Sequence, residues 1–299
     1  MWVSIGRIII LLFLVNTAFA QYFPMHTQVT NNLQLNNPAY AGFSGKLNGF
    51  LMSRHQWVGM EGEPNTQFLY LNGAPKDRNM GWGLGIMNDQ IGYLNFSQVS
   101  ASYSYRIKLG IGQLSMGLQG GFLNQRIDPT LLNLDNTVDD SFDEQNLNLW
   151  RPQFGFGFYY ESRKLALGVA VPWLLKGSTL SFQTEQHIFG NAAYLLSIAE
   201  NIKFKPAIQA KVLPGATWQV DLVGNFIMWN RLWLTGGVRR GEGYFTGMRI
   251  KAAKSIWAGY SYDRMIGTLR GVSGYNTHEI FISFNIEHKN LNHRSPRYF

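Results

Sequence analysis

The stretch IKFKPAIQAKV, residues 202–212, alternates apolar and polar side chains and carries a proline, Pro206, near its centre. Successive side chains of a β-strand point to opposite faces of a sheet, so this alternation predicts a strand with one apolar and one polar face. The lysines Lys203, Lys205 and Lys211 share the polar face. Apart from Ala207, the apolar residues alternate with these lysines and therefore lie on the other face of the strand.

The same period-two pattern recurs along the chain and predicts an all-β protein. Most segments approach the roughly 9 to 11 residues that a tilted membrane-spanning strand requires. Fourteen such segments lie at residues 45–54, 66–73, 81–90, 94–106, 113–124, 150–161, 163–172, 190–199, 202–211, 216–229, 231–239, 243–250, 254–263 and 276–286.

The lengths of the connections favour a membrane barrel over a soluble sandwich. The four long connections, at residues 55–65, 125–149, 174–189 and 264–275, all follow odd-numbered segments. Outer-membrane barrels alternate short periplasmic turns with long extracellular loops, whereas a sandwich has no reason to keep this parity. We therefore predict a transmembrane antiparallel β-barrel of about 14 strands with both termini in the periplasm.

Tryptophans near the predicted strand ends also favour a barrel in lipid. Aromatic side chains gather at both membrane interfaces of outer-membrane barrels. Core filling is the alternative explanation of these residues. The tryptophans concerned are Trp57, Trp82, Trp150, Trp173, Trp218, Trp229, Trp233 and Trp257.

The first twenty residues have the features of a secretory signal peptide. Arg7 precedes an apolar run at residues 8–15, and small residues precede a cleavage site between Ala20 and Gln21. The apolar run is too short for a spanning helix, which needs roughly 20 residues. We expect a signal peptide at residues 1–20, a periplasmic N-terminal segment at 21–43, an outer-membrane barrel at 44–287 and a basic tail at 288–299.

Composition excludes several classes of function. The chain has no cysteine, which rules out disulfides, thiolate metal sites, a cysteine nucleophile and a lipoprotein anchor. The formal charge is +8, but the basic residues are scattered singly, so we expect no nucleic-acid binding.

We also expect no enzyme activity and no cofactor. His278 and Glu279 are neighbours on one predicted strand and point to opposite faces, so they cannot line one catalytic site. The glycines near residues 81–85 and 155–157 lack the spacing and the following helix of a dinucleotide fingerprint. The acidic stretch at 135–144 is expected to be a solvated loop, with calcium binding as the alternative.

Several stretches resemble the PorP/SprF family of outer-membrane proteins, which is associated with type IX secretion in Bacteroidota. They follow one another along nearly the whole mature chain. The stretches are NPAYAG (37–42), RHQWVGMEGEPNTQ (54–67), GLGIMNDQIG (83–92), GVAVP (168–172), KVLPGATWQVDL (211–222), AGYSYDRMIGTLRG (258–271) and HEIFISFNI (278–286).

The resemblance implies a Gram-negative outer-membrane barrel that supports export or surface attachment of cargo, including adhesins, and gliding motility. Its expected partners are outer-membrane lipid, type IX translocon components and secreted cargo with a C-terminal sorting domain. Family-motif positions with a possible interaction or structural role are Asn37, Pro38, Tyr40, Gly42, Arg54, Gln56, Trp57, Gly59, Asn88, Asp89 and Gly92.

The first of these stretches is expected before the barrel and the second in its first external loop. Three roles are open for the polar residues of that loop: narrowing the pore, contacting cargo, or bracing the barrel mouth by hydrogen bonds. A diffusion or substrate channel is the alternative function, because lumen-facing Arg106, Lys203, Lys205 and Lys211 would favour anions. A passive anchor for an adhesin is a third possibility.

Pro206 makes a sharper structural prediction. A proline has no N–H to donate, and a closed barrel has no edge strand to accommodate it. We therefore expect a bulge or a lost hydrogen bond in the wall at this residue.

Overall fold

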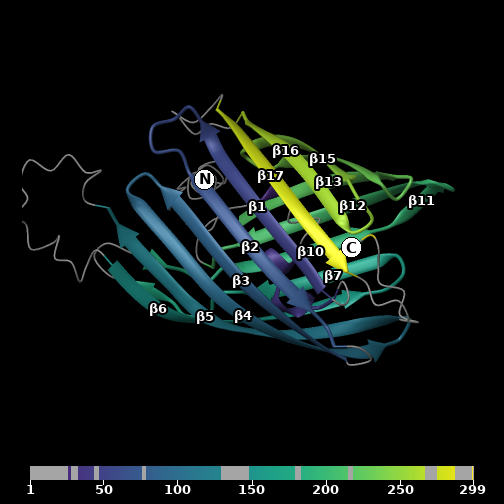
Figure 1. Cartoon of the computed structure of the whole chain (residues 1–299), viewed down its shortest axis with the longest axis horizontal. Helices are drawn as coiled ribbons and strands as arrows, with labels where there is room; N and C mark the ends of the chain where they lie inside the picture. The colour runs from purple at the N-terminus through teal and green to yellow at the C-terminus, as the bar shows by residue number, and fades with distance from the viewer. Residues whose placement is uncertain are drawn as a thin grey trace, which may run out of the picture.

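The computed structural model describes residues 26–27, 33–43, 47–75, 79–128, 148–178, 183–214, 218–266, 275–286 and 298. One antiparallel sheet closes on itself, because β10 pairs with both β7 and β12 (Figure 1). The wall consists of β1 (Leu47–Val58), β2 (Asn65–Gly73), β3 (Met80–Ile91), β4 (Leu94–Leu109), β5 (Gly112–Ile127), β6 (Asn148–Glu161), β7 (Leu165–Val171), β10 (Ile188–Tyr194), β11 (Leu196–Ala199), β12 (Ile202–Val212), β13 (Trp218–Met228), β14 (Leu232–Arg239), β15 (Gly243–Lys251), β16 (Ile256–Met265) and β17 (Asn276–Ile286).

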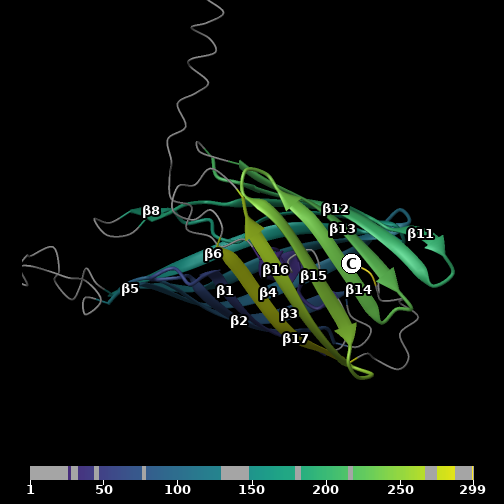
Figure 2. The ribbon, with the colours of Figure 1, turned by 90° about the horizontal axis from the view of Figure 1, so that it is seen from above.

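β10 and β11 are two pieces of one span, so the wall has fourteen spans, as predicted. The strands slant relative to the long axis of the barrel in both ribbon views (Figures 1 and 2). A small separate hairpin, β8 (Gly177–Ser178) with β9 (Gln183–Thr184), lies between β7 and β10. In the part of the chain that the structure describes, no helix has the length and apolar character needed to cross a membrane.

The two ends of the barrel differ in their connections. We call the end where β1 finishes the loop end; its connections are residues 59–64, 92–93, 128–147, 172–187, 213–217, 240–242 and 266–275. The opposite end is the turn end, with connections at 74–79, 110–111, 162–164, 200–201, 229–231 and 252–255. The long loops therefore lie at one end, and the periplasmic position of the turn end stays a prediction.

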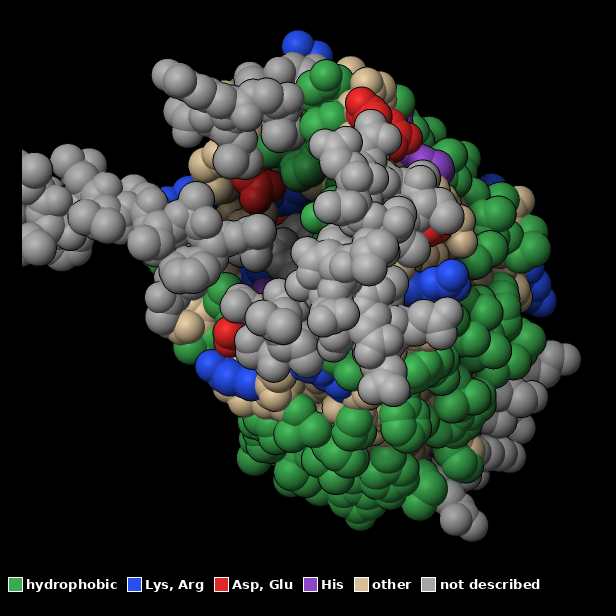
Figure 3. All heavy atoms as spheres, turned by 90° about the vertical axis from the view of Figure 1, so that its left-hand side faces the viewer, with side chains coloured by type: hydrophobic (Ala, Val, Ile, Leu, Met, Phe, Trp, Pro, Cys, Tyr) green, Lys and Arg blue, Asp and Glu red, His purple; other side chains and the backbone are tan. Residues whose placement is uncertain are grey.

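Side chains alternate across the wall as expected for a barrel in lipid. On β5, Leu118 and Phe122 point outward and are 65% and 57% exposed, whereas Ser115 points inward and is buried. Seen from the loop end, hydrophobic side chains cover the outer wall and charged side chains gather at the opening (Figure 3). An apolar exterior around a polar interior is the arrangement that a bilayer requires.

Pro206 has two neighbouring strands in the wall, and the pairing is regular with one of them and interrupted with the other. Pairing with β13 runs without a register shift through Pro206 opposite Gly224, so the bulge expected there is absent. On the other side, pairing stops after Ala193 opposite Ala207 and resumes at Leu196 opposite Phe204. The gap between β10 and β11 thus faces the residue that has no N–H to donate.

The tryptophans divide between the two faces of the wall. Trp82, Trp150, Trp218 and Trp229 are between 39% and 60% exposed, consistent with interfacial positions. Trp173 and Trp233 are instead 1% and 4% exposed and belong to clusters of buried apolar side chains. For these two residues, core filling was the correct interpretation.

Candidate functional site in the barrel lumen

Residues of the N-terminal segment lie inside the barrel. We call the described part, residues 26–27 and 33–43, the plug; it contains the short 3-10 helices η2 (Leu33–Leu35) and η3 (Pro38–Tyr40). Asn37 begins η3 because its side chain accepts a hydrogen bond from Ala39 N at 2.9 Å, and Pro38 occupies the first position, where its fixed φ suits a helix. The segment predicted to precede the barrel is therefore, in its described residues, part of the barrel interior.

Hydrogen bonds hold the plug against the wall. Side chains of β2, β4 and β5 satisfy plug N–H and C=O groups that are buried away from solvent, and the plug side chain of Asn37 donates to a backbone carbonyl of β6. The bonds are Asn37 Nδ2 to Phe158 O (3.0 Å), Ser115 Oγ to Ala39 O (2.6 Å), Ser104 Oγ to Ala41 O (2.7 Å), Arg106 Nη1 to Gly42 O (2.6 Å) and Gly42 N to Asn72 Oδ1 (3.1 Å).

Glycines of the wall make room for the plug. A Cβ on Gly117 of β5 would collide with backbone atoms of Pro38 and Ala39. At Gly42, φ is +64°, and a Cβ would collide with Gly73 and Gly81 of the facing wall. Only glycine combines that backbone conformation with so close an approach.

The aromatic residues of the plug pack on the same part of the wall, at β6. Tyr40 and Phe43 stack on each other, with ring centroids 5.7 Å apart, and both contact Tyr159 of β6 edge to face. Tyr40 is 6% exposed, and burial raises the pKa of its phenol above its ordinary value. The NPAYAG stretch is thus anchored by aromatic packing as well as by hydrogen bonds.

The other end of the plug contacts a buried cluster of charged side chains near the loop end. Thr27 N donates to Glu279 Oε2 at 3.2 Å, and Thr27 Oγ1 donates to Asp263 Oδ1 at 2.8 Å. Arg54 bridges the same two carboxylates, at 3.0 Å to Glu279 and 3.1 Å to Asp263. Arg54 therefore ties β1, β16 and β17 together at the two carboxylates that the plug contacts.

A second arginine extends this charged cluster along the wall. Arg239 of β14 donates from Nε and Nη2 to the carboxylate of Asp221 on β13, at 3.0 to 3.1 Å, and lies 3.5 Å from Asp263. Both arginines are less than 10% exposed. Removing one partner of a buried ion pair strongly destabilises the fold, because the other partner is left as an uncompensated buried charge.

His26 lies in these surroundings as a neutral side chain. Burial, followed by the positive charges of Arg54, Arg239 and Lys211, lowers its pKa from 6.5 to about 3. The histidine is 2% exposed. Protonation of His26 therefore opposes the docking of the plug.

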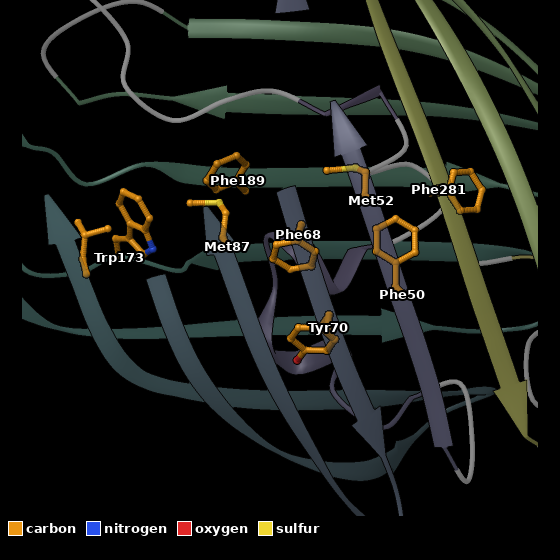
Figure 4. Close-up of a cluster of buried hydrophobic side chains, with 9 residues drawn as sticks. Phe50, Met52, Phe68, Tyr70, Met87, Trp173, Phe189 and Phe281 are labelled. Carbon is orange, nitrogen blue, oxygen red and sulfur yellow. The ribbon is translucent and has the colours of Figure 1, made fainter. Parts of the chain in front are cut away.

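Apolar side chains fill another part of the lumen (Figure 4). The cluster contains Phe50, Met52, Phe68, Tyr70, Met87, Leu123, Trp173, Phe189 and Phe281, and Leu35 of the plug packs against it. Trp173 comes from the connection after β7, which turns into the barrel so that Trp173 Nε1 donates to Gln98 Oε1 at 3.1 Å. The lumen is thus occupied by the plug, this inward connection and wall side chains.

The inward lysines of β12 do not line an open aqueous pore. Lys205 and Lys211 are 1% and 3% exposed, and Lys205 Nζ lies 4.7 Å from the ring centroid of Trp233. Lys203 Nζ donates to the hydroxyl of Tyr298 at 2.7 Å. Arg106, as described above, holds the plug.

The remaining family-motif residues brace strands and turns. Arg54, Gln56 and Trp57 lie in β1 and not in the external loop where we expected them, because β1 continues through an irregularity between His55 and Val58. Trp57 has φ of 62° and its N–H donates to Thr277 Oγ1 at 3.2 Å. Among the three roles left open for this stretch, bracing is the one that these contacts provide.

The turns next to β1 and β3 are held in a similar way. Gly59 N donates to Glu63 Oε2 at 2.8 Å, and Gly92 N donates to Gly62 O at 3.0 Å; both glycines have positive φ. On β3, Asn88 points outward and accepts from Ser97 Oγ at 2.8 Å. Asp89 points inward and accepts from Thr66 Oγ1 at 2.6 Å.

Sequence reasoning missed the acidic partners of Arg54 and Arg239. Asp263, Glu279 and Asp221 each fall on the inward parity of their strand, so alternation alone shows that they face the lumen. Their pairing with arginines of other strands depends on the closed order of the sheet. The local sequence pattern shows neither the order of the strands in the sheet nor the contact of residues 26–27 with these acidic side chains.

Among the described residues, no group of three or more His, Cys, Asp and Glu side chains is arranged to hold a metal ion. The acidic stretch at 135–144 and the cleavage site at Ala20 and Gln21 lie outside the described residues. So does the C-terminal tail except Tyr298.

Comparison with known proteins shows the family to which the chain belongs. The sequence profile described as type IX secretion system membrane protein PorP/SprF matches residues 18–284. The chain belongs to the PorP/SprF family. It is therefore a membrane component of the type IX secretion system, and its barrel fold places it in the outer membrane. No curated protein matches this PorP/SprF chain.

Solved structures with a similar fold are outer-membrane barrels. The CymD monoaromatic hydrocarbon channel is 11% identical, aligns with 91% of this chain and 96% of its own, and gives a TM-score of 0.51. The Acinetobacter baumannii outer membrane protein Omp33 is 6% identical over 82% of this chain and 100% of its own, with a TM-score of 0.48. At such low identity, the similarity of CymD to this PorP/SprF protein concerns the fold alone.

Proposed function

We propose that this protein is a closed scaffold of type IX secretion, which holds a cargo's C-terminal domain or the translocon at the outer membrane and so supports export or attachment of surface adhesins. The observation that carries the proposal is the occupied lumen. The described residues of the plug contact Asp263 and Glu279 in one part of it and Ser115 and Phe158 in another. Because the described side chains fill the lumen in this way, we infer that the protein acts through the surfaces of its wall and loops and not as a water-filled passage for solutes.

Docking would use the loop end. Its connections are the longest in the chain, and the buried ion pairs of Arg54 and Arg239 stiffen the wall immediately below them. Binding residues are commonly carried by loops on a rigid scaffold. The plug contributes indirectly, because it keeps the supporting wall packed from within.

A deletion strain tests this proposal against the channel alternative. The scaffold proposal expects loss of adhesin from the cell surface while uptake of small solutes is unchanged. Complementation with the full-length gene should restore the adhesin, and complementation with a signal-deleted gene should not. Loss of solute uptake with adhesin still on the surface would favour the channel and contradict the proposal.

Co-purification separates a transient docking role from a passive anchor. The tagged protein is extracted from its native membrane, and the proteins that accompany it are identified. Translocon subunits together with cargo in the process of export support docking. Mature adhesin bound without any translocon subunit would indicate a passive anchor instead.

A further inference from the structure

The turn end of the barrel has a ring of exposed basic side chains. Because they lie in or beside the connections after β4, β6, β13 and β15, they follow the perimeter of the closed wall and are not gathered on one side. We call these residues the basic rim: Lys108, Arg163, Lys164, Arg231 and Lys254.

Among the residues that the structure describes, the turn-end connections carry little acidic charge. Glu200 is the single Asp or Glu in the described residues of the turn-end connections. No residue of the basic rim forms an ion pair with a described acidic side chain. At the loop end, Glu61 is exposed and Glu63, Glu185 and Glu242 are partly exposed. The positive charge of the rim is therefore left without a partner in the described protein.

Exposed aromatic side chains lie in or next to the same connections. Tyr105 and Tyr194 point outward and are 42% and 43% exposed, and Trp229 is 59% exposed. Leu195 N donates to Lys164 O at 2.7 Å, which brings the turn of Lys164 beside Tyr194. Tyrosine and tryptophan mark the membrane–water interface, and lysine and arginine extend from it toward the headgroups.

We propose that the basic rim binds the phosphate groups of anionic phospholipids in the adjoining leaflet. A ring along the perimeter fits lipid, which surrounds the barrel, better than it fits a protein partner, which would contact one side. Anionic lipid attracts basic residues beside a membrane, and the attraction falls within a Debye length. The inference is independent of the scaffold function and of the side of the membrane that the turn end faces.

The test compares two sets of four substitutions in the full mature protein. The rim variant is R163Q/K164Q/R231Q/K254Q, and the matched control is R126Q/K176Q/R240Q/R264Q at the loop end, which removes the same charge. Native mass spectrometry in detergent measures how much phosphatidylglycerol or phosphatidylcholine each protein retains. Heat-modifiable migration on a gel checks that each barrel is folded.

The rim variant should retain roughly tenfold less phosphatidylglycerol than wild type, with phosphatidylcholine unchanged, since each basic side chain near a membrane adds to the attraction for anionic lipid. The control should retain wild-type amounts, and raising the salt should reduce the wild-type value toward that of the rim variant. Should the fourfold variant not fold, R163Q/K164Q and R231Q/K254Q are each expected to lose part of the binding.

Two results would overturn the inference. One is equal retention of phosphatidylglycerol by wild type, rim variant and control. If the rim variant at the same time loses an acidic protein that binds the wild type, the rim is a protein-binding surface and not a lipid site. The other is an equal loss in the rim variant and the control, which would show an effect of net charge and not of a site.

Discussion

At the scale of single residues, glycine decides where the plug can lie against the wall. Gly117 and Gly120 are three positions apart on β5, but they have opposite surroundings. A Cβ on Gly117 would collide with plug backbone, whereas a Cβ on Gly120 would meet only the ring of Phe154 at 3.8 Å, an ordinary contact. The sequence does not distinguish the two, because the difference lies in a segment about 80 residues away.

Replacing Gly117 by valine should therefore displace the plug. We expect a loss of about 1 to 3 kcal/mol in stability, since the backbone of the plug cannot yield as a flexible side chain would. Limited proteolysis should cut between residues 26 and 43 faster in Gly117→Val than in wild type. Gly120→Ala serves as the control and should behave as wild type. Equal protection of the segment in Gly117→Val would show that the plug does not depend on this contact.

Arg54 provides a second prediction at this scale. Arg54→Gln should lower the free energy of unfolding by about 3 to 5 kcal/mol, because Glu279 and Asp263 are left buried with less compensating charge. The exposed pair of Lys176 with Glu185, 3.3 Å apart, is the comparison: Lys176→Gln should cost less than about 1 kcal/mol. Denaturant-induced unfolding in detergent measures both. A similar small effect for the two substitutions would contradict the assigned role of Arg54.

At the scale of elements, alternation was sufficient to find every wall strand, because the side-chain period of a strand is local. It was insufficient where a strand is irregular. The alternation predicts a first strand that ends at residue 54, yet β1 reaches Val58 across a register shift. Similarly, Pro206 was correctly expected to disturb the wall, but pattern could not show that only the β10 and β11 side is interrupted.

The plug is the element that sequence located least well. The NPAYAG stretch was found through its family resemblance, but nothing in its local pattern shows that it lies inside a barrel. Its helices are single turns, too short to be stable alone, and its position depends on contacts with strands remote in sequence. Such non-local pairings require the closed sheet to be known first.

His26 makes the docking of the plug depend on pH. Its pKa is about 3 in the folded protein and 6.5 when unfolded, so the stabilisation is complete above pH 6.5 and is lost as the pH falls toward 3. Near pH 5.5, docking should be weakened about tenfold, or about 1.4 kcal/mol. Hydrogen exchange of residues 33–43 measures this directly. His26→Gln should remove most of the dependence between pH 5 and 7; an unchanged dependence would assign it to other groups.

At the scale of the whole molecule, the barrel combines a lipid-facing wall with an interior that is packed like a protein core. The apolar cluster around Phe68 and the ion pairs of Arg54 and Arg239 lie in different parts of one lumen, and the plug contacts both. This packing supports the proposal that a barrel of fourteen spans, wide enough to hold an aqueous passage, acts in secretion as a scaffold and not as a solute pore.

Single-channel recording in planar bilayers tests the closed lumen most directly. Purified wild-type protein is compared with a variant that lacks residues 26–43 but keeps the signal peptide and the wall. We expect wild-type protein to insert without conductance steps, and the deletion variant to give ion-conducting steps in the same bilayers. Steady open-channel steps from wild-type protein, equal in size to those of the deletion variant, would contradict the account.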